Sequence, residues 1–272
     1  MRAVHAGIFG LLLALAVLSA PGAGADETRL GAVSATCVAS PYAAAEGEAG
    51  GIAALVAWLR AALPPGDTLR EAFEAQAPEL CLAETIFGAE GYLGVEDNRI
   101  VLRRTLAPGM IRAVLIHELR HLHQTRLGAC PSPALSMQET ARVTLAMEAD
   151  ASAVSLAVAW RLREQGDGAV WEALAAWPSH ADIAAAFAGE MARGTGVEAA
   201  TARAFAQWYL SDWRRETYYI AACSAYLDRQ DRAHALPRYG AAAADFLQTL
   251  CRLPDGRAYP CVAPGAVRQR QE

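Results

Sequence analysis

The chain alternates between segments in which apolar residues recur at helical spacing and segments of turn-forming residues. The first clear helical pattern covers residues 52–63 and ends at a Pro-Pro-Gly sequence, because these residues do not continue a helix. Thr68, with Glu71 three residues later, predicts the capped start of a second helix. Residues 26–50 are rich in glycine and alanine, and we expect them to be irregular.

The pattern then changes to short apolar runs separated by turn residues. These runs predict β-strands at 86–87, 92–95 and 99–102. The Glu-Asp-Asn sequence between the last two runs is typical of a tight turn, which reverses the chain direction. We therefore expect a small antiparallel sheet in this region.

After the predicted sheet, helical spacing of apolar residues continues almost to the end of the chain. Helices are predicted at 111–124, 136–164, 169–177, 181–193, 197–232 and 241–250. The predicted fold class is therefore α+β and mostly α-helical. The small antiparallel sheet would precede helix 111–124, and a helical bundle would follow it.

The predicted elements fit one domain. A length of 272 residues allows one sizeable hydrophobic core or two small ones. We place a single domain at 26–261, with an N-terminal helical part (26–83), a central part (84–165) and a C-terminal helical part (166–261). Residues 262–272 have no pattern that predicts order, and we expect a flexible tail.

The N-terminal residues indicate the compartment. Arg2 precedes an apolar run at 8–20, and an Ala-Gly-Ala sequence at 23–25 follows at the spacing of a cleavage site. A membrane span needs about 20 residues, so this run is too short for an anchor. We expect a secretory signal peptide at 1–25, a secreted or periplasmic protein, and no stable membrane anchor after cleavage.

Cysteine content agrees with export. The six cysteines are Cys37, Cys81, Cys130, Cys223, Cys251 and Cys261. An even number in an exported chain predicts disulfide bonds, and no C-x-x-C spacing indicates a cysteine metal site. Cys251–Cys261 is the first pair we expect, because the prolines and the Asp-Gly sequence between them let the chain fold back.

Charge argues against one class of partner. The formal net charge is −5, and all 24 basic residues are arginine. No basic patch with interleaved aromatic residues occurs along the sequence. We therefore expect no nucleic-acid partner.

Residues 117–121 read His-Glu-Leu-Arg-His, an HExxH pattern inside predicted helix 111–124. Histidines four residues apart lie about 40° apart around a helix, so His117 and His121 can reach one metal ion from adjacent turns. Glu118 lies to the side, where it can act on a water but is poorly aimed at the ion. Without a partner, burying these three groups would be costly. The pattern therefore predicts a zinc site in the central part, which would be the catalytic core.

A catalytic zinc usually has three protein ligands and an open position for water, so a third ligand is needed. On the same helix, His123 lies about 120° from His117 and should point elsewhere, as a surface or packing residue. Gln124 lies on the metal side, where it could contact substrate or orient a ligand.

Predicted helix 136–164 is apolar or small on almost every side, yet it holds Glu148 and Asp150. These acids lie about 160° apart around the helix, so only one can face the metal. We choose Glu148, because small residues on its side allow close packing and its longer arm spans the gap between helices. Asp150 would pair with an arginine or a backbone donor, or support a ligand. The alternative is that both acids form structural salt bridges.

An HExxH motif with a downstream glutamate on the following helix resembles the gluzincin type of zincin metallopeptidase. More narrowly, residues 115–124 and 147–160 are similar to an uncharacterised bacterial family of candidate metallopeptidases. The resemblance is specific over 85–165. It implies a zincin-like fold, zinc held by His117, His121 and Glu148, and Glu118 as general base. The best-studied gluzincins have aspartate four residues after the ligand glutamate. Ser152 stands there in this chain, which leaves the residues that orient the histidines unassigned.

The resemblance and the motif together predict a zinc-dependent metallopeptidase that acts on peptide or protein substrates. Candidates for a second donor to the developing oxyanion are Tyr218, Tyr219, Arg214 and Arg215. Two alternatives remain. One is a zinc-binding exported protein without catalysis, and the other is a structural helical domain whose motif is a coincidence.

Overall fold

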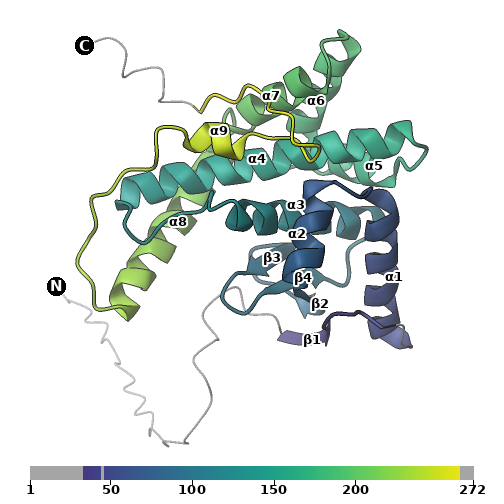
Figure 1. The fold of residues 1–272 in the computed structure, drawn as a ribbon, viewed down its shortest axis with the longest axis horizontal. Coiled ribbons are helices and arrows are strands. Elements are labelled where there is room, and N and C mark those ends of the chain that lie inside the picture. Colours follow the sequence, from purple (N-terminus) through teal and green to yellow (C-terminus); the bar gives the residue numbers. More distant parts are fainter. Residues whose placement is uncertain (1–32, 44–45, 264–272) are drawn as a thin grey trace, which may run out of the picture.

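The computed structural model describes residues 33–43 and 46–263 (Figure 1). The predicted signal peptide at 1–25 and most of the predicted tail lie outside these residues. The described chain is mixed α+β and mostly helical, which confirms the predicted class. Its strands are β1 (Val33–Val38), β2 (Glu79–Thr85), β3 (Gly91–Gly94) and β4 (Arg99–Arg103). Its helices are α1 (Gly47–Ala62), α2 (Thr68–Gln76), α3 (Pro108–Arg126), α4 (Met137–Glu164), α5 (Ala169–Ala176), α6 (Ala181–Ala192), α7 (Val197–Trp208), α8 (Asp212–Arg232) and α9 (Phe246–Leu250).

The sheet has the order β1-β2-β4-β3 and is mixed, so the expectation of a wholly antiparallel sheet is wrong, whereas the antiparallel pairing predicted for the strands at 92–95 and 99–102 is confirmed. The β1–β2 and β3–β4 pairs are antiparallel, but β2 and β4 are parallel. The reason lies in β4, where Ile100, Val101 and Leu102 are all buried. A strand that is apolar on both sides belongs at the centre of a sheet, and β4 therefore lies between β2 and β3.

The N-terminal elements also differ from the prediction in detail. The strand predicted at 86–87 is absent, and the chain is instead extended just before it, in β2. Residues 33–38, expected to be irregular, form β1, which pairs with β2 and is joined to it by the Cys37–Cys81 disulfide. Asp67, not Thr68, caps α2, since its carboxylate accepts a hydrogen bond from the Leu69 N–H.

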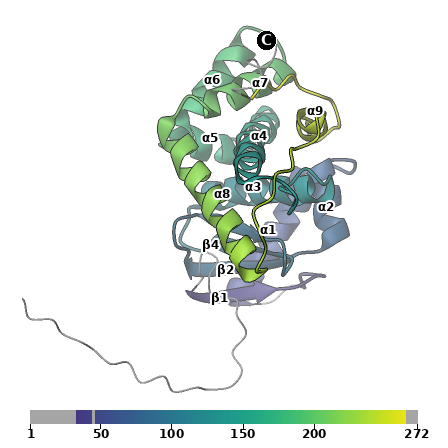
Figure 2. The ribbon, with the colours of Figure 1, turned by 90° about the vertical axis from the view of Figure 1, so that its left-hand side faces the viewer.

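Helix α4 is the centre of the molecule. It contacts α3, α5, α6, α7, α8 and α9, and Figure 2 shows it nearly end-on among them. Alanine and serine fill most of its buried positions, so neighbouring helices can approach closely. By length and composition, α4 could cross a membrane, but 72% of its apolar window is buried inside the described structure. Such burial is also typical of a core helix.

The C-terminal helices depart from the predicted boundaries. The helix predicted at 197–232 is broken at residues 209–211, where the Ser211 hydroxyl caps α8 by accepting from the Arg214 N–H. The helix predicted at 241–250 is reduced to the short α9. The break lets α8 turn away from α7 and run across α4 (Figures 1 and 2). This crossing places α8 next to the face of α4 that meets α3.

Candidate metal centre

Helix α3 presents its two motif histidines from one side. Pro108 at its first turn suits a helix start, and the apolar residues Leu115, Ile116 and Leu119 are buried in the main core. His117 and His121 are one turn apart, with ring centroids 4.7 Å apart and ring planes nearly perpendicular. Their Nε2 atoms are 3.0 Å apart, so both nitrogens point to the same space.

Glu148 of α4 completes the group. Its Oε2 lies 3.4 Å from His117 Nε2, and its Oε1 lies 3.4 Å from His121 Nε2. Zinc bonds of about 2.0–2.1 Å in a tetrahedral arrangement place ligand atoms about 3.3 Å apart. The three observed separations are close to this value, and the donor set is one that zinc prefers. The three side chains keep 15–19% of their surface exposed, so the group is reachable from solvent.

The charges in this group favour a cation. Burial would raise the pKa of Glu148, but the charges of His121 and His117 and their hydrogen bonds hold it well below its usual range. Burial would lower the pKa of His121, but Glu148 raises it to about 9. Glu148 therefore stays ionised, as a metal ligand must, and a bound metal ion would displace the proton that Glu148 stabilises on the ring of His121.

Glu118 occupies the position that the helical phase predicted, beside the three ligand atoms and not among them. It is 5% exposed, and burial raises the pKa of its carboxyl group. The backbone of Leu93, in the edge strand β3, hydrogen-bonds this carboxylate. A buried carboxylate with a raised pKa is suited to exchange protons near neutral pH.

Gln124 holds one ring nitrogen of His121. Its Oε1 lies 2.8 Å from His121 Nδ1, and its Nε2 donates to the Met147 carbonyl (3.0 Å) and to Asp150 Oδ2 (2.6 Å). Two acceptors around Nε2 fix the amide orientation, so Oε1 must accept from a protonated Nδ1. His121 Nε2 then carries the lone pair that a metal needs.

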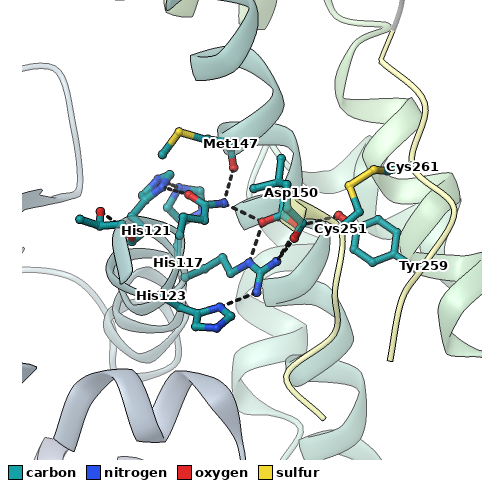
Figure 3. A network of polar contacts seen from close by, with 12 residues as sticks. His117, His121, His123, Met147, Asp150, Cys251, Tyr259 and Cys261 are labelled. Carbon is teal, nitrogen blue, oxygen red and sulfur yellow. Dashed lines mark hydrogen bonds and ion pairs between the residues drawn. A yellow bond between two sulfur atoms is a disulfide. The ribbon is translucent and has the colours of Figure 1, made fainter. Parts of the chain in front are cut away.

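His123 and Asp150 are two further residues that the sequence placed on these helices but not among the metal ligands. His123 points away from His117 and is buried, with its Nδ1 2.9 Å from Arg120 Nη1, so it is a packing residue. Asp150 is fully buried and paired with Arg120, and it also holds Gln124. Figure 3 shows Asp150 between the two motif histidines and the segment that carries Tyr259. Asp150 thus both pairs with an arginine and supports a ligand.

Within the described residues, one other set of three side chains comes close enough to share a metal ion. It consists of Cys37, Glu79 and Cys81. The two sulfur atoms are joined in a disulfide, so they are not available as thiolate ligands. His117, His121 and Glu148 are therefore the group with free donor atoms.

The comparison with known families agrees with this geometry. A sequence model of the family described as "Putative metallopeptidase family (DUF6782)" matches residues 25–261. The chain belongs to this family. No curated protein and no solved structure gives a match. Membership in a metallopeptidase family implies a metal ion, and the match spans both the motif helix and the helix that carries Glu148.

Four residues of this metallopeptidase family member were candidates for the oxyanion donor, and the structure gives them different surroundings. Arg214 is committed to Asp182 and to backbone carbonyls, and Arg215 pairs with Asp212 at the surface. Tyr219 is 46% exposed. The charge of Glu148, then burial, then the charge of Glu118 raise the pKa of Tyr218, which makes it the one of the four whose phenol is coupled to the carboxylates of the site.

His180, in the turn between α5 and α6, is a residue near the site that sequence reasoning missed. Its ring stacks on Trp177 at 4.2 Å, and its Nδ1 lies 3.1 Å from the Ser179 hydroxyl. Burial, followed by the positive charges of His117 and Arg214, lowers its pKa to about 3. Nothing in the Trp-Pro-Ser-His sequence indicates this location, because it depends on how the α5–α6 turn packs.

Proposed function

We propose that the protein is an exported zinc-dependent metallopeptidase, in which His117, His121 and Glu148 hold zinc and Glu118 is the general base. The observation that carries the proposal is the convergence of three ligand atoms beside a fourth, buried carboxylate. Two histidines and one carboxylate with an open position are the ligand set of a catalytic zinc. A structural zinc usually has four protein ligands, often cysteine.

The chemistry divides between the metal and the chain's own residues. A bound zinc ion supplies Lewis acidity, which lowers the pKa of water and polarises a carbonyl oxygen. The Glu118 carboxylate accepts one proton from the attacking water and later gives a proton to the leaving amine, so that it returns to its starting state. The raised pKa of Glu118 suits both transfers, because it brings the pKa of this carboxyl group closer to the pKa values of the water and of the leaving amine.

Tyr218 is the donor that we assign to the developing negative charge on the carbonyl oxygen. Glu148 and burial raise its pKa, so its phenol keeps its proton at neutral pH and can donate a hydrogen bond. The ring packs against Trp208 of α7, with centroids 5.4 Å apart, which limits its movement. A fixed donor at the site stabilises the transition state more than the bound substrate.

Export and a peptide substrate are parts of the same proposal. The Cys37–Cys81 and Cys251–Cys261 disulfides support an oxidising compartment, as does the signal-peptide pattern at 1–25. Family membership supports peptide or protein substrates. A reachable site formed by partly exposed ligands is compatible with an extended substrate.

The experiment uses the exported protein, purified with its disulfides intact. Zinc content is measured first, and a peptide library is then incubated with the protein, with and without a chelator. We expect one zinc per chain and cleavage that the chelator stops. The variant Glu118→Gln should keep its zinc and lose about 100-fold to 10,000-fold in rate. Glu172→Gln, an exposed glutamate on α5, is the matched control and should cleave normally.

Three outcomes would overturn the proposal. The first is wild-type protein without stoichiometric zinc. The second is a Glu118→Gln variant that cleaves as fast as the wild type. The third is wild-type protein with full zinc and no cleavage of any library peptide, which would favour the alternative of a non-catalytic zinc-binding protein.

A further inference from the structure

Asp150 is the centre of a buried polar network behind the metal site. Its carboxylate is fully buried and accepts four hydrogen bonds. Arg120 donates through Nε to Oδ2 (2.6 Å) and through Nη2 to Oδ1 (2.9 Å). Gln124 Nε2 donates to Oδ2 and the Tyr259 hydroxyl donates to Oδ1, each at 2.6 Å. These donors come from α3 and from the segment after α9.

The network reaches the metal ligand through one side chain. Gln124 is held by Asp150 on its nitrogen side and contacts His121 Nδ1 on its oxygen side. Any movement of the Asp150 carboxylate therefore shifts the amide that selects the ring orientation of His121. Residues that orient a metal ligand in this way contribute to metal affinity without touching the ion.

The C-terminal partner of Asp150 belongs to a loop closed by a disulfide. Tyr259 lies between Cys251 and Cys261, which are bonded to each other, and its N–H donates to the Cys251 carbonyl. The residue before the loop, Leu250, accepts from Arg120 Nη2 at 2.7 Å. Figure 3 shows the disulfide and Tyr259 on the side of Asp150 opposite His117 and His121. The contacts made by Tyr259 and Leu250 thus both end on the Arg120–Asp150 pair.

We infer that Tyr259, held by the Cys251–Cys261 loop, is a positioning residue for His121 that acts through Asp150 and Gln124. The inference rests on the proposed function for the identity of the metal. Without the Tyr259 hydroxyl, Oδ1 of a buried carboxylate loses a short, charge-assisted hydrogen bond. Tyr259 is only 3% exposed, so water does not readily replace the donor. The carboxylate then has freedom to turn, and Gln124 and His121 turn with it.

The test compares two buried tyrosines of the same aromatic cluster. Tyr259 and Tyr209 both pack against Phe205, but the Tyr209 hydroxyl has no hydrogen-bond partner among the described residues. Zinc dissociation constants are measured by competition with a chelator, and melting temperatures are measured on zinc-free protein to verify folding. We expect Tyr259→Phe to weaken zinc binding about tenfold, and Tyr209→Phe to leave the constant unchanged.

A second pair of variants tests the loop. Cys251→Ala with Cys261→Ala should weaken zinc binding in the same direction, because the loop then no longer fixes Tyr259. Cys37→Ala with Cys81→Ala removes a disulfide from the sheet and should keep wild-type affinity. NMR of the imidazole nitrogens in the zinc-loaded protein adds a measurement that does not change when the protein merely becomes less stable. The Nδ1–H signal of His121 should shift in Tyr259→Phe and not in Tyr209→Phe.

The outcomes separate this inference from the proposed function. Wild-type protein without zinc would overturn both. Stoichiometric zinc in the wild type, with equal dissociation constants for Tyr259→Phe and Tyr209→Phe, would overturn the positioning role alone. A Cys251/Cys261 double variant that folds and binds zinc like the wild type would overturn the role of the loop.

Discussion

Arg120 and Asp150 form a two-point ion pair in which neither side chain is exposed to solvent. Arg120 is one of the two variable residues of the HExxH motif, and it points away from the metal site. The same turn of α3 therefore presents metal ligands on one side and anchors itself to α4 on the other. Desolvation makes such a pair costly to form, but breaking it leaves a buried charge without a partner.

The first prediction concerns this pair. Arg120→Met and Asp150→Leu should each lower the free energy of unfolding by about 3–5 kcal/mol, because each leaves one buried charge unpaired. The double variant should lose roughly 1–3 kcal/mol less than the sum. Denaturant unfolding of the four proteins measures the coupling. Arg60–Glu74 has the same two-point geometry at the surface, and its cycle should give less than about 1 kcal/mol. Additive losses at the buried pair would contradict the prediction.

A second prediction concerns the contact between α3 and α5. A Cβ on Gly109 would lie 2.5 Å from the Ala169 carbonyl oxygen, a backbone atom that cannot rotate away. Gly109→Ala should therefore lower the free energy of unfolding by about 1–3 kcal/mol. Gly189→Ala in α6 is the control, since nothing lies within 4 Å of its Cβ position. It should gain about 0.5–1 kcal/mol from helix propensity. Equal effects of the two substitutions in thermal unfolding would show that α3 and α5 can separate.

Helical phase, together with the small residues on the side of Glu148 and its longer side chain, anticipated which side chains converge at the site. The spacing of His117 and His121 and the angle between Glu148 and Asp150 follow from the helix itself. The structure places His117, His121 and Glu148 together and turns Asp150 toward Arg120, as that argument expects. Local chain reversal likewise predicted the Cys251–Cys261 disulfide, which the structure confirms.

Contacts between segments that are distant in sequence could not be predicted from helical phase or local turn patterns. Tyr259 meets Asp150 across 109 positions, and no local pattern encodes that distance. The expectation of a wholly antiparallel sheet failed for the same reason, because the parallel β2–β4 pair joins strands that are separated in sequence by β3. The break at 209–211 has no proline or glycine to mark it, and the Ser211 cap of α8 is the local signal that the sequence offered there.

The third prediction tests the assignment of Tyr218. Tyr218→Phe should lower kcat by about 100-fold to 1,000-fold with little change in KM, because the lost hydrogen bond acts mainly in the transition state. Zinc content should stay at the wild-type level, since Tyr218 is not a ligand. Tyr219→Phe removes the same group from the next, exposed position of α8 and should have no effect on kcat. Steady-state kinetics on one cleaved peptide measures kcat and KM for both variants. A lowered kcat in both would count against the assignment of Tyr218.

The fourth prediction concerns how stability falls at acid pH and the partly buried ring of His180. The folded pKa of His180 is lowered to about 3 by burial and by the charges of His117 and Arg214, whereas an unfolded histidine titrates near 6.5. Between these values only the unfolded chain binds the proton, so the free energy of unfolding must fall as pH falls. The slope from this group is at most about 1.4 kcal/mol per pH unit.

His180→Phe should remove that slope while keeping the stack on Trp177. Urea unfolding of chelator-treated protein at several pH values between 4 and 8 gives the free energy of unfolding of the wild type and of the variant. In the difference between the two, the contributions of titrating groups common to both cancel. The wild type should lose stability relative to the variant as the pH is lowered below about 6.5. His234→Asn, at an exposed position after α8, should follow the wild-type curve. A difference that stays constant from pH 8 to pH 4 would mean that His180 accepts a proton in the folded protein, and that the ring is not held against the positive charges of the site.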